Sequence, residues 1–432
     1  MVVISEYFHS VILDSDLCKG CINCIKRCPT EAIRVQNGKA YIITERCIDC
    51  GECIRVCPHH AKKARFDNMA IMDGFTYKIA LPAPALYGQY NRLDDLDILL
   101  TGLKHMGFDD VFEVARAAEL VTDATRKLMS KKRDKTDGPL ISSACPAIVR
   151  LIQVRFPELH KNIVPLEAPM EIAAIMAKKE AAEKTGLPMD EIGAFFLSPC
   201  PAKVTAAKAP IGREKSAVDG VFAIKDVYPR LLEKMNKIDN PESLSQCGVI
   251  GVSWAGIGGE AAGLLSAEYL SADGIENVMR VLEELEDERL NELDFLELNA
   301  CFGGCVGGVL NVENPYVAKA RLSKLRKHRP VSCNHLPTDA IPENMLWSAD
   351  EGEHKSVLKL SDDIWEAFSL MEKIDSIEKA FPQLDCGSCG APTCRALAED
   401  IVLRSASESS CVFRMRDEVN NAADALSALN KV

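Results

Sequence analysis

The chain has 432 residues, 47% of them hydrophobic and 26% charged, which is enough for about two to four globular domains and too apolar for a disordered protein. Its net charge of −12 argues against a nucleic-acid-binding protein. No run reaches the ~18 apolar residues that span a membrane, and the N-terminus lacks a secretory signal pattern. We therefore expect a cytoplasmic protein without membrane insertion, in which a dense set of cysteines, among 18 in all, binds metal rather than forming disulfides.

Two copies of one cysteine motif open the chain, CKGCINCIKRCP from Cys18 and CIDCGECIRVCP from Cys47. Each copy is Cys-x2-Cys-x2-Cys-x3-Cys-Pro, the bacterial ferredoxin spacing, in which the fourth cysteine ligates the cluster of the other copy. The spacing predicts two 4Fe-4S clusters, one on Cys18, Cys21, Cys24 and Cys57 and one on Cys47, Cys50, Cys53 and Cys28. The segment resembles a two-cluster ferredoxin-like domain that carries electrons, and we assign it residues 1–70. Zinc knuckles are the disfavoured alternative, and His59 and His60 are interpreted as surface residues.

Residues 71–372 have a different pattern. Short apolar runs, KIALPAPAL from Lys78 and VIGVSW from Val249, alternate with helical stretches at 170–184 and 275–290. This alternation predicts strands and helices in α/β layers, so the expected class is a multidomain α/β and α+β protein. The stretch 329–350, rich in proline and charge, predicts a loop. A further helix is expected at 362–373.

Four cysteines of this middle region lie in short motifs: Cys145 in SSACPAIVRL, Cys200 in FLSPCPAKVTAAK, and Cys301 and Cys305 in LELNACFGGCVGG. Taken singly, each fits a small buried hydrophobic residue. Taken in this order, after LPAPAL and LKHMGFDDVFEVARAAEL, they resemble the three signature motifs of the FeFe-hydrogenase (iron-only hydrogenase) catalytic domain. The resemblance covers residues 76–330.

The resemblance implies a cofactor and an activity. In that family the matching cysteines hold the H-cluster, a 4Fe-4S cubane joined to a two-iron subsite with carbon monoxide, cyanide and a dithiolate bridge. Carried over, Cys145, Cys200 and Cys301 are cubane ligands, Cys305 is the bridging thiolate, and Lys203 hydrogen-bonds a cyanide. The implied enzyme interconverts H2 and protons, with electrons relayed by 4Fe-4S clusters to a ferredoxin-like carrier or a companion subunit.

Several positions depart from the family's pattern. Ala144 stands where the family has a proton-transferring cysteine, Ser198 and Ala206 replace a methionine and a glutamate, and Asn299 replaces a methionine. This combination is similar to the sensory FeFe-hydrogenases, which implies slow turnover and a signalling partner protein. Glu260, in WAGIGGEAAG, is a candidate replacement proton carrier. The alternative is a helix N-terminal glutamate stabilised by the macrodipole.

The last cysteines have the spacing Cys-x2-Cys-x4-Cys-x16-Cys and predict a third metal centre. The predicted ligands are Cys386, Cys389, Cys394 and Cys411. Gly387 and Gly390 allow the backbone to fold tightly and to point amides at the cluster sulfurs. The segment resembles a small, mostly helical 4Fe-4S module of anaerobic electron-transfer proteins, assigned to 373–432, and a structural zinc site is the alternative.

Two other hypotheses stay open for the whole chain. In one, the hydrogenase-like domain holds only a 4Fe-4S cubane and no diiron site, and the chain is an electron-transfer subunit or scaffold. In the other, the chain is an unrelated reductase that uses the same clusters. Separately, Gly256-x-Gly258-x-x-Ala261 meets the loose dinucleotide fingerprint between a strand-like run and a helix, which predicts NAD binding, with close strand-to-helix packing as the alternative. The remaining cysteines are interpreted as a core residue, Cys247, and a loop or satellite-core residue, Cys333.

Overall fold

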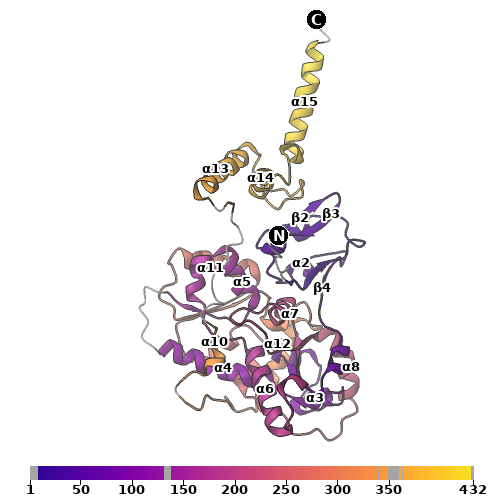
Figure 1. Ribbon diagram of the computed structural model, residues 1–432, viewed down its shortest axis with the longest axis vertical. Coiled ribbons are helices and arrows are strands. Elements are labelled where there is room, and N and C mark those ends of the chain that lie inside the picture. Colours follow the sequence, from indigo (N-terminus) through magenta and orange to yellow (C-terminus); the bar gives the residue numbers. More distant parts are fainter. Residues whose placement is uncertain (1–7, 131–137, 339, 349–359, 362, 430–432) are drawn as a thin grey trace. The chain divides into compact units, whose positions relative to one another are not determined.

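The computed structural model describes residues 8–130, 138–338, 340–348, 360–361 and 363–429. The chain forms two compact units (Figure 1). The first unit comprises residues 1–11, 48–51 and 64–355, and the second comprises 12–47, 52–63 and 356–432. None of the described helices is both long and apolar enough to cross a membrane.

The first unit contains two parallel sheets and the helices that cover them. Its strands are β5 (Tyr77–Pro82), β6 (Asp110–Val111), β7 (Leu140–Ile141), β8 (Ile192–Ser198), β9 (Gly220–Ala223), β10 (Tyr269–Asp273) and β11 (Phe295–Asn299). Its helices are α3 (Leu96–Lys104), α4 (Val114–Ser130), α5 (Pro146–Arg155), α6 (Pro169–Thr185), α7 (Pro201–Lys208), α8 (Ile224–Met235), α9 (Val249–Ser253), α10 (Gly259–Gly263), α11 (Ile275–Glu286) and α12 (Pro315–Leu325).

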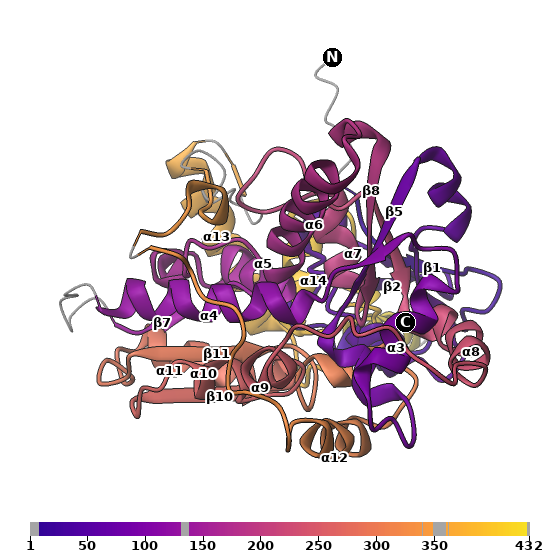
Figure 2. The same ribbon diagram turned by 90° about the horizontal axis from the view of Figure 1, so that it is seen from below.

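The larger sheet has the order β6-β5-β8-β9 and is buried on both faces. Because side chains alternate along a strand, Phe196 of β8 joins the core beneath α4 and α6, and its neighbour Phe195 joins the core beneath α3 and α8. Helix α6 packs on β5 and β8 with α4 beside it (Figure 2). Continuous apolar strands of this kind are typical of parallel sheets with helices on both sides.

The smaller sheet has the order β10-β11-β7, with Leu296 of β11 paired to Ile141 of β7. Leu296 and Leu298 join the core formed with α5 and α11, and α10 contacts β10 and β11. The α/β class predicted from the sequence is confirmed. The helices expected at 170–184 and 275–290 are α6 and α11, and the run from Lys78 falls on β5.

The strand expected in VIGVSW is wrong, because Val249–Ser253 is helix α9. Hydropathy alone does not separate a short buried helix from a buried strand. Gly251 decides the packing, since a Cβ at this position would overlap the carbonyl of Ala115 on α4. The glycines that follow connect α9 to α10, so residues 249–263 lack the strand that a dinucleotide-binding turn requires.

The second unit combines the two ends of the chain. Its elements are β1 (Val11–Leu13), α1 (Asn23–Lys26), β2 (Ile33–Gln36), β3 (Lys39–Ile42), α2 (Glu52–Arg55), β4 (Lys62–Ala64), α13 (Ile364–Ala380), α14 (Cys394–Val402) and α15 (Val412–Leu429). Strands β1 and β4 pair, and β2 pairs antiparallel with β3. Both residues of the turn from β2 to β3, Asn37 and Gly38, have positive φ, as a two-residue Asn-Gly hairpin requires. The helix expected at 362–373 is α13.

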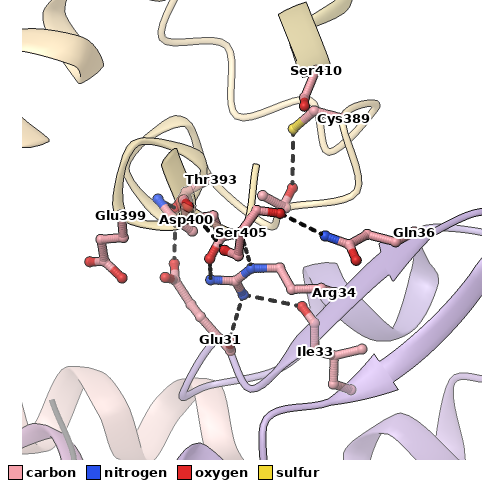
Figure 3. A network of polar contacts seen from close by, with 12 residues as sticks. Glu31, Ile33, Arg34, Gln36, Cys389, Thr393, Glu399, Asp400, Ser405 and Ser410 are labelled. Carbon is pink, nitrogen blue, oxygen red and sulfur yellow. Dashed lines mark hydrogen bonds and ion pairs between the residues drawn. The ribbon is translucent and has the colours of Figure 1, made fainter. Parts of the chain in front are cut away.

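A buried ion pair joins the two halves of this unit (Figure 3). The side chain of Arg34, on β2, is 2% exposed and donates through Nε and Nη2 to the two carboxylate oxygens of Asp400 on α14, at 2.6 and 3.2 Å. Its remaining nitrogen donates to the carbonyl of Glu31 at 2.7 Å. Arg46 pairs with Glu399 at 3.0 Å beside it. Removing one partner of such a buried pair costs about 3–5 kcal/mol, because the other charge is left uncompensated.

Backbone contacts reinforce this ion pair. The Val35 amide on β2 donates to the Gly390 carbonyl at 2.8 Å. Lys26 on α1 donates through Nζ to the carbonyls of Asp385 and Pro392, the latter at 2.8 Å. Gly390 has φ +88, and a Cβ there would overlap the carbonyl oxygen of Val35. The loop that carries Cys386 and the next predicted ligands therefore lies directly on β2 and α1.

We expect Gly390→Ala to destabilise the second unit more than Gly38→Ala. Both glycines have positive φ, which costs an alanine about 1–2 kcal/mol, but Gly38 has open space where a Cβ would go. Gly390→Ala adds a steric overlap, so the total loss should reach roughly 3 kcal/mol or more. Thermal unfolding of the full chain followed by circular dichroism measures both, and equal losses would show that β2 and the loop are not in close contact.

Candidate functional site

The predicted cysteine ligands of the first unit follow the carboxyl ends of parallel strands. Cys145 comes after β7, Cys200 after β8 and Cys301 after β11. Sites in α/β folds form at these ends of the strands. Cys145 and Cys200 are also the N-caps of α5 and α7, each followed by proline at the first helical position, where proline is favoured. The helix N-termini carry partial positive charge and favour an anionic group beside them.

The structure brings the thiols of Cys145, Cys200 and Cys305 together with Lys203. The Nζ of Lys203 donates to the Cys305 Sγ at 3.5 Å. Burial raises the pKa of Cys200 to about 11, and the Lys203 charge opposes that rise. Burial likewise raises the pKa of Cys145, whose thiol also feels Lys203 and Cys305. Burial alone would lower the pKa of Lys203, but the neighbouring thiolates raise it above its usual range.

The fourth predicted ligand, Cys301, lies in a glycine turn. Its carbonyl accepts from the Gly304 amide at 3.1 Å, and Gly303 and Gly304 both have positive φ. A Cβ at Gly304 would lie 2.5 Å from the amide nitrogen of Ile257. The turn ends in the short 3-10 helix Cys305–Gly307. The glycines thus allow the backbone to pass close to its neighbours between the two cysteines.

A cavity of about 50 Å³, partly open to solvent, adjoins this cluster of thiols at Cys305. Its lining includes all four residues predicted to be catalytic: Ala144, Lys203, Glu260 and Cys305. Phe196, Met170 and Trp254 are among its apolar walls. A thiol, a buried cation and a carboxyl group facing an apolar space can bind a compact, anionic metal complex next to the Cys305 sulfur. The donor set therefore fits the two-iron subsite that the resemblance implies.

Glu260 has partners across the site rather than along its own helix. The Ser142 hydroxyl donates to its Oε2 at 2.7 Å, and Ser142 Oγ accepts from the Ala144 amide at 3.2 Å. Burial raises the pKa of Glu260 to about 8, with repulsion from Glu297 as the next cause. Glu260 does lie in the first turn of α10, but that helix has only five residues. Its side chain hydrogen-bonds to the segment between β7 and α5 that carries Ser142.

Glu297 completes an acidic pair that the sequence interpretation missed. It lines the same cavity, and its carboxylate accepts from the amides of Gly258 and Ala261, both at 2.9 Å. Burial raises its pKa to about 7, and these amide hydrogen bonds oppose the rise. The signal was a single acid within the buried run FLELN of β11. Strand placement was needed to show which face that acid occupies.

The thiols predicted to hold the first ferredoxin cluster also converge. Burial raises the pKa of Cys24, and the nearby thiols of Cys21, Cys57 and Cys18 raise it further. The Ala40 amide donates to Cys18 Sγ at 3.4 Å, and the Ala61 amide donates to Cys57 Sγ at 3.3 Å. Amides directed at cysteine sulfurs are a feature of iron-sulfur sites. The donor set fits a 4Fe-4S cluster.

Other predicted ligands are distributed as follows. Of the second ferredoxin set, Cys28, Cys47 and Cys53 lie in the second unit, and Cys50 belongs to the segment 48–51 of the first unit. Three C-terminal cysteines, Cys389, Cys394 and Cys411, share one small core. Burial raises the pKa of Cys389, with further contributions from the thiols of Cys386 and Cys411.

The two histidines and two cysteines that the sequence did not predict to be ligands lie on the surface or in the core, away from the cavity beside Lys203. His59 and His60 are exposed, as predicted. Cys247 is in the core, as predicted, where its Sγ donates to Glu113 at 3.1 Å. Cys333 is exposed in a loop. Neither of these two cysteines lines the cavity beside Lys203.

Comparison with known families decides the family of the chain. The family model described as iron only hydrogenase large subunit, C-terminal domain, matches residues 77–247 and 260–309, just over half of the chain. The chain belongs to the iron-only hydrogenase family. A 4Fe-4S dicluster domain model matches residues 10–58, and a model of an Fe-S cluster segment matches residues 381–413. The resemblance inferred from the motifs is confirmed.

The proteins similar to this chain include both hydrogenases and Fe-S cluster assembly factors. Iron hydrogenase 1 of Clostridium pasteurianum is 24% identical over an alignment of 397 residues, and the match covers 75% of this chain and 69% of the relative. The cytosolic Fe-S cluster assembly factor NAR1 of Scheffersomyces stipitis is 23% identical over an alignment of 268 residues, and the match covers 52% of this chain and 49% of the relative. Among solved structures, FeFe-hydrogenase HydA1 from Chlamydomonas reinhardtii is 17% identical, with a TM-score of 0.47 over 59% of this chain and 87% of that chain.

The buried Glu260 of this hydrogenase-family chain predicts a pH-dependent stability. The folded chain keeps the proton of Glu260 up to a pH of about 8, whereas an unfolded chain loses it near pH ~4.3. Between these values the folded state binds more protons, so its stability falls as pH rises. Glu260→Gln removes that fall. Its unfolding free energy relative to the parent chain should therefore increase from pH 5 to pH 8.

Denaturant unfolding across this pH range measures the difference. Glu292→Gln serves as a control, because Glu292 is exposed. The pH dependence of this control should match that of the parent chain. A Glu260→Gln curve parallel to the parent curve would contradict the raised pKa.

Proposed function

We propose that the chain is a slow hydrogenase of the sensory type, which interconverts H2 and protons at an H-cluster in the first unit. The observation that carries the proposal is the cavity that Cys305, Lys203 and Glu260 line together. In this proposal the cubane ligands are Cys145, Cys200 and Cys301, and Cys305 bridges to the two-iron subsite. When bound, that group would supply an iron site at which H2 is split heterolytically.

Lys203 orients and stabilises the anionic part of the cofactor. Its side chain is buried and its Nζ hydrogen-bonds Cys305 Sγ. A buried ammonium group forms strong hydrogen bonds with anions, because little water screens the charge. The remaining hydrogens on Nζ can therefore be donated to a cyanide ligand that lies in the cavity. The same charge offsets the negative charge of the surrounding thiolates.

The acidic pair supplies the proton step that Ala144 does not. A methyl side chain carries no exchangeable proton, but the carboxyl group of Glu260 lines the same cavity. Its raised pKa lets it hold and release a proton near neutral pH. Ser142 fixes its orientation, and Glu297 lies beside it as the next acceptor. Transfer through carboxyl groups on the cavity wall is consistent with slow turnover.

The remaining clusters are proposed to form the electron relay. The ferredoxin-type clusters and the C-terminal cluster would pass single electrons to a ferredoxin-like carrier or a companion subunit. A signalling partner that responds to the redox state of the chain would give the slow reaction a regulatory use. The contact of the Cys386 loop with α1 and β2 supports a relay that includes the C-terminal cluster.

The second candidate function is an electron-transfer or assembly scaffold that holds only a cubane in the first unit. Two observations favour it. The relatives include an Fe-S cluster assembly factor, and Ala144 and Asn299, both in the lining of the cavity, depart from the family's pattern. The two proposals differ in one property, which is the presence of the two-iron subsite.

Infrared spectroscopy tests this property directly. The full chain, with its 4Fe-4S clusters reconstituted and a synthetic two-iron precursor added, should show carbon monoxide and cyanide stretching bands. Lys203→Met, which keeps the length but loses the charge, should shift the cyanide bands. If the parent chain shows no such bands after full reconstitution, the scaffold is the correct function.

Restoring a proton donor should increase turnover. Ala144→Cys places a thiol at the edge of the cavity, and we expect H2 production to rise roughly 100-fold or more, the contribution typical of one positioned general acid. Ala144→Ser adds an atom of similar size but a far less acidic proton, so it serves as the matched control. Glu260→Gln should lower turnover in the parent chain and less so in Ala144→Cys. An unchanged or lower rate in Ala144→Cys would contradict the proposed proton route.

A further inference from the structure

The internal repeat of the ferredoxin-like segment contains one change of charge at a buried position. When Cys28 of the first motif is aligned with Cys57 of the second, Ile33 aligns with Lys62. Both side chains are buried to the same extent, with 3% of each exposed. Ile33 begins β2 and Lys62 begins β4. The same place in the repeat is therefore apolar beside one predicted cubane and basic beside the other.

Lys62 lacks a hydrogen-bond partner for its amine. Among the described residues, its Nζ is a buried nitrogen that no acceptor satisfies. An unpaired buried amine costs free energy, so a nearby anion is needed to compensate it. The next residue, Lys63, contrasts with it, because its exposed amine pairs with Asp14 at 2.7 Å.

Two sulfur atoms on which the charge of Lys62 acts belong to the first predicted cluster. The charge of Lys62 acts on the thiols of both Cys24 and Cys57. Burial alone would raise the pKa of Cys57, but backbone hydrogen bonds, one of them from Lys62, and the Lys62 charge lower it. Both cysteines are in the set predicted for the first cubane. The missing counter-ion of Lys62 therefore lies where that cluster binds.

We propose that Lys62 stabilises the reduced form of the cluster held by Cys18, Cys21, Cys24 and Cys57, and so makes it easier to reduce than its repeat partner. A 4Fe-4S core of charge 2+ with four thiolates carries a net charge of −2. One electron from an external one-electron donor takes the core to 1+ and the net charge to −3, and no bond forms or breaks. A fixed positive charge stabilises the −3 state more than the −2 state, which raises the reduction potential.

The consequence is an asymmetric pair of cubanes built from a nearly symmetric repeat. An electron that enters the ferredoxin-like segment would rest on the cluster beside Lys62, since the second cluster has Ile33 at the equivalent place. This inference requires the ferredoxin-type clusters but not the two-iron subsite. It therefore holds for either function proposed above.

The test is a redox titration of the full, cluster-loaded chain followed by electron paramagnetic resonance. Lys62→Ile copies the residue that already packs at the equivalent place in the repeat. One reduction step should move to lower potential by at least 59 mV, which is a tenfold change in the ratio of reduced to oxidised cluster. Lys62→Arg keeps the charge and should keep the parent potential. Lys63→Met removes the exposed neighbouring charge and should leave all steps unchanged.

The outcomes separate charge from packing. Unchanged potentials in Lys62→Ile would overturn the proposal, as would an equal shift in Lys62→Arg. Lys62→Met provides a second neutral variant with a flexible chain of similar length. If Lys62→Ile binds iron poorly, Lys62→Met takes its place and should show the same shift to lower potential. Iron content measured alongside each titration confirms that every variant is compared with all its clusters present.

Discussion

The site in the first unit depends on a group of buried thiols whose negative charge, when they ionise, is offset by one buried lysine. Cys145, Cys200 and Cys305 gather around Lys203, and each thiolate would be expensive to bury alone. Their common position follows from the fold, because Cys145 and Cys200 follow the carboxyl ends of strands in the two sheets, where α5 and α7 begin with their positive ends. Lys203 and the two helix N-termini therefore supply positive charge at this site that does not depend on bound iron.

Burial also explains why the pKa values of the two carboxyl groups in this cavity are raised. In a wet cleft, Glu260 and Glu297 would be ionised and would repel each other. Burial in the cavity raises both pKa values instead, and repulsion from Glu297 adds to the rise at Glu260. Ser142 and the amides at the start of α10 hold the two carboxyl groups in place. An alanine at position 144 is compatible with such a site because the cavity wall itself is acidic.

Sequence patterns predicted the parts of the molecule whose chemistry is local. Cysteine spacing and the Cys-Pro pairs indicated which thiols would come together, because a ligand loop must satisfy its geometry within a few residues. The VIGVSW prediction was wrong because α9 depends on a distant contact, the approach of Gly251 to α4. Glu297 was missed for a related reason, since its burial depends on α10 and on the neighbouring strands. The repeat in the sequence places Lys62 opposite Ile33, but only the structure shows that the amine of Lys62 is buried without a hydrogen-bond partner among the described residues.

Lys203 and Lys62 are two buried lysines with similar surroundings in the two units. Each is a buried cation beside thiolates, and each raises the stability of the more negative state next to it. At Lys203 the charge has a hydrogen-bond partner in Cys305, so its direction as well as its sign is defined. At Lys62 no protein acceptor among the described residues defines a direction, so the charge acts through its proximity alone. Binding an anionic ligand requires a directed hydrogen bond, as at Lys203. Raising a reduction potential requires only a nearby positive charge, as at Lys62.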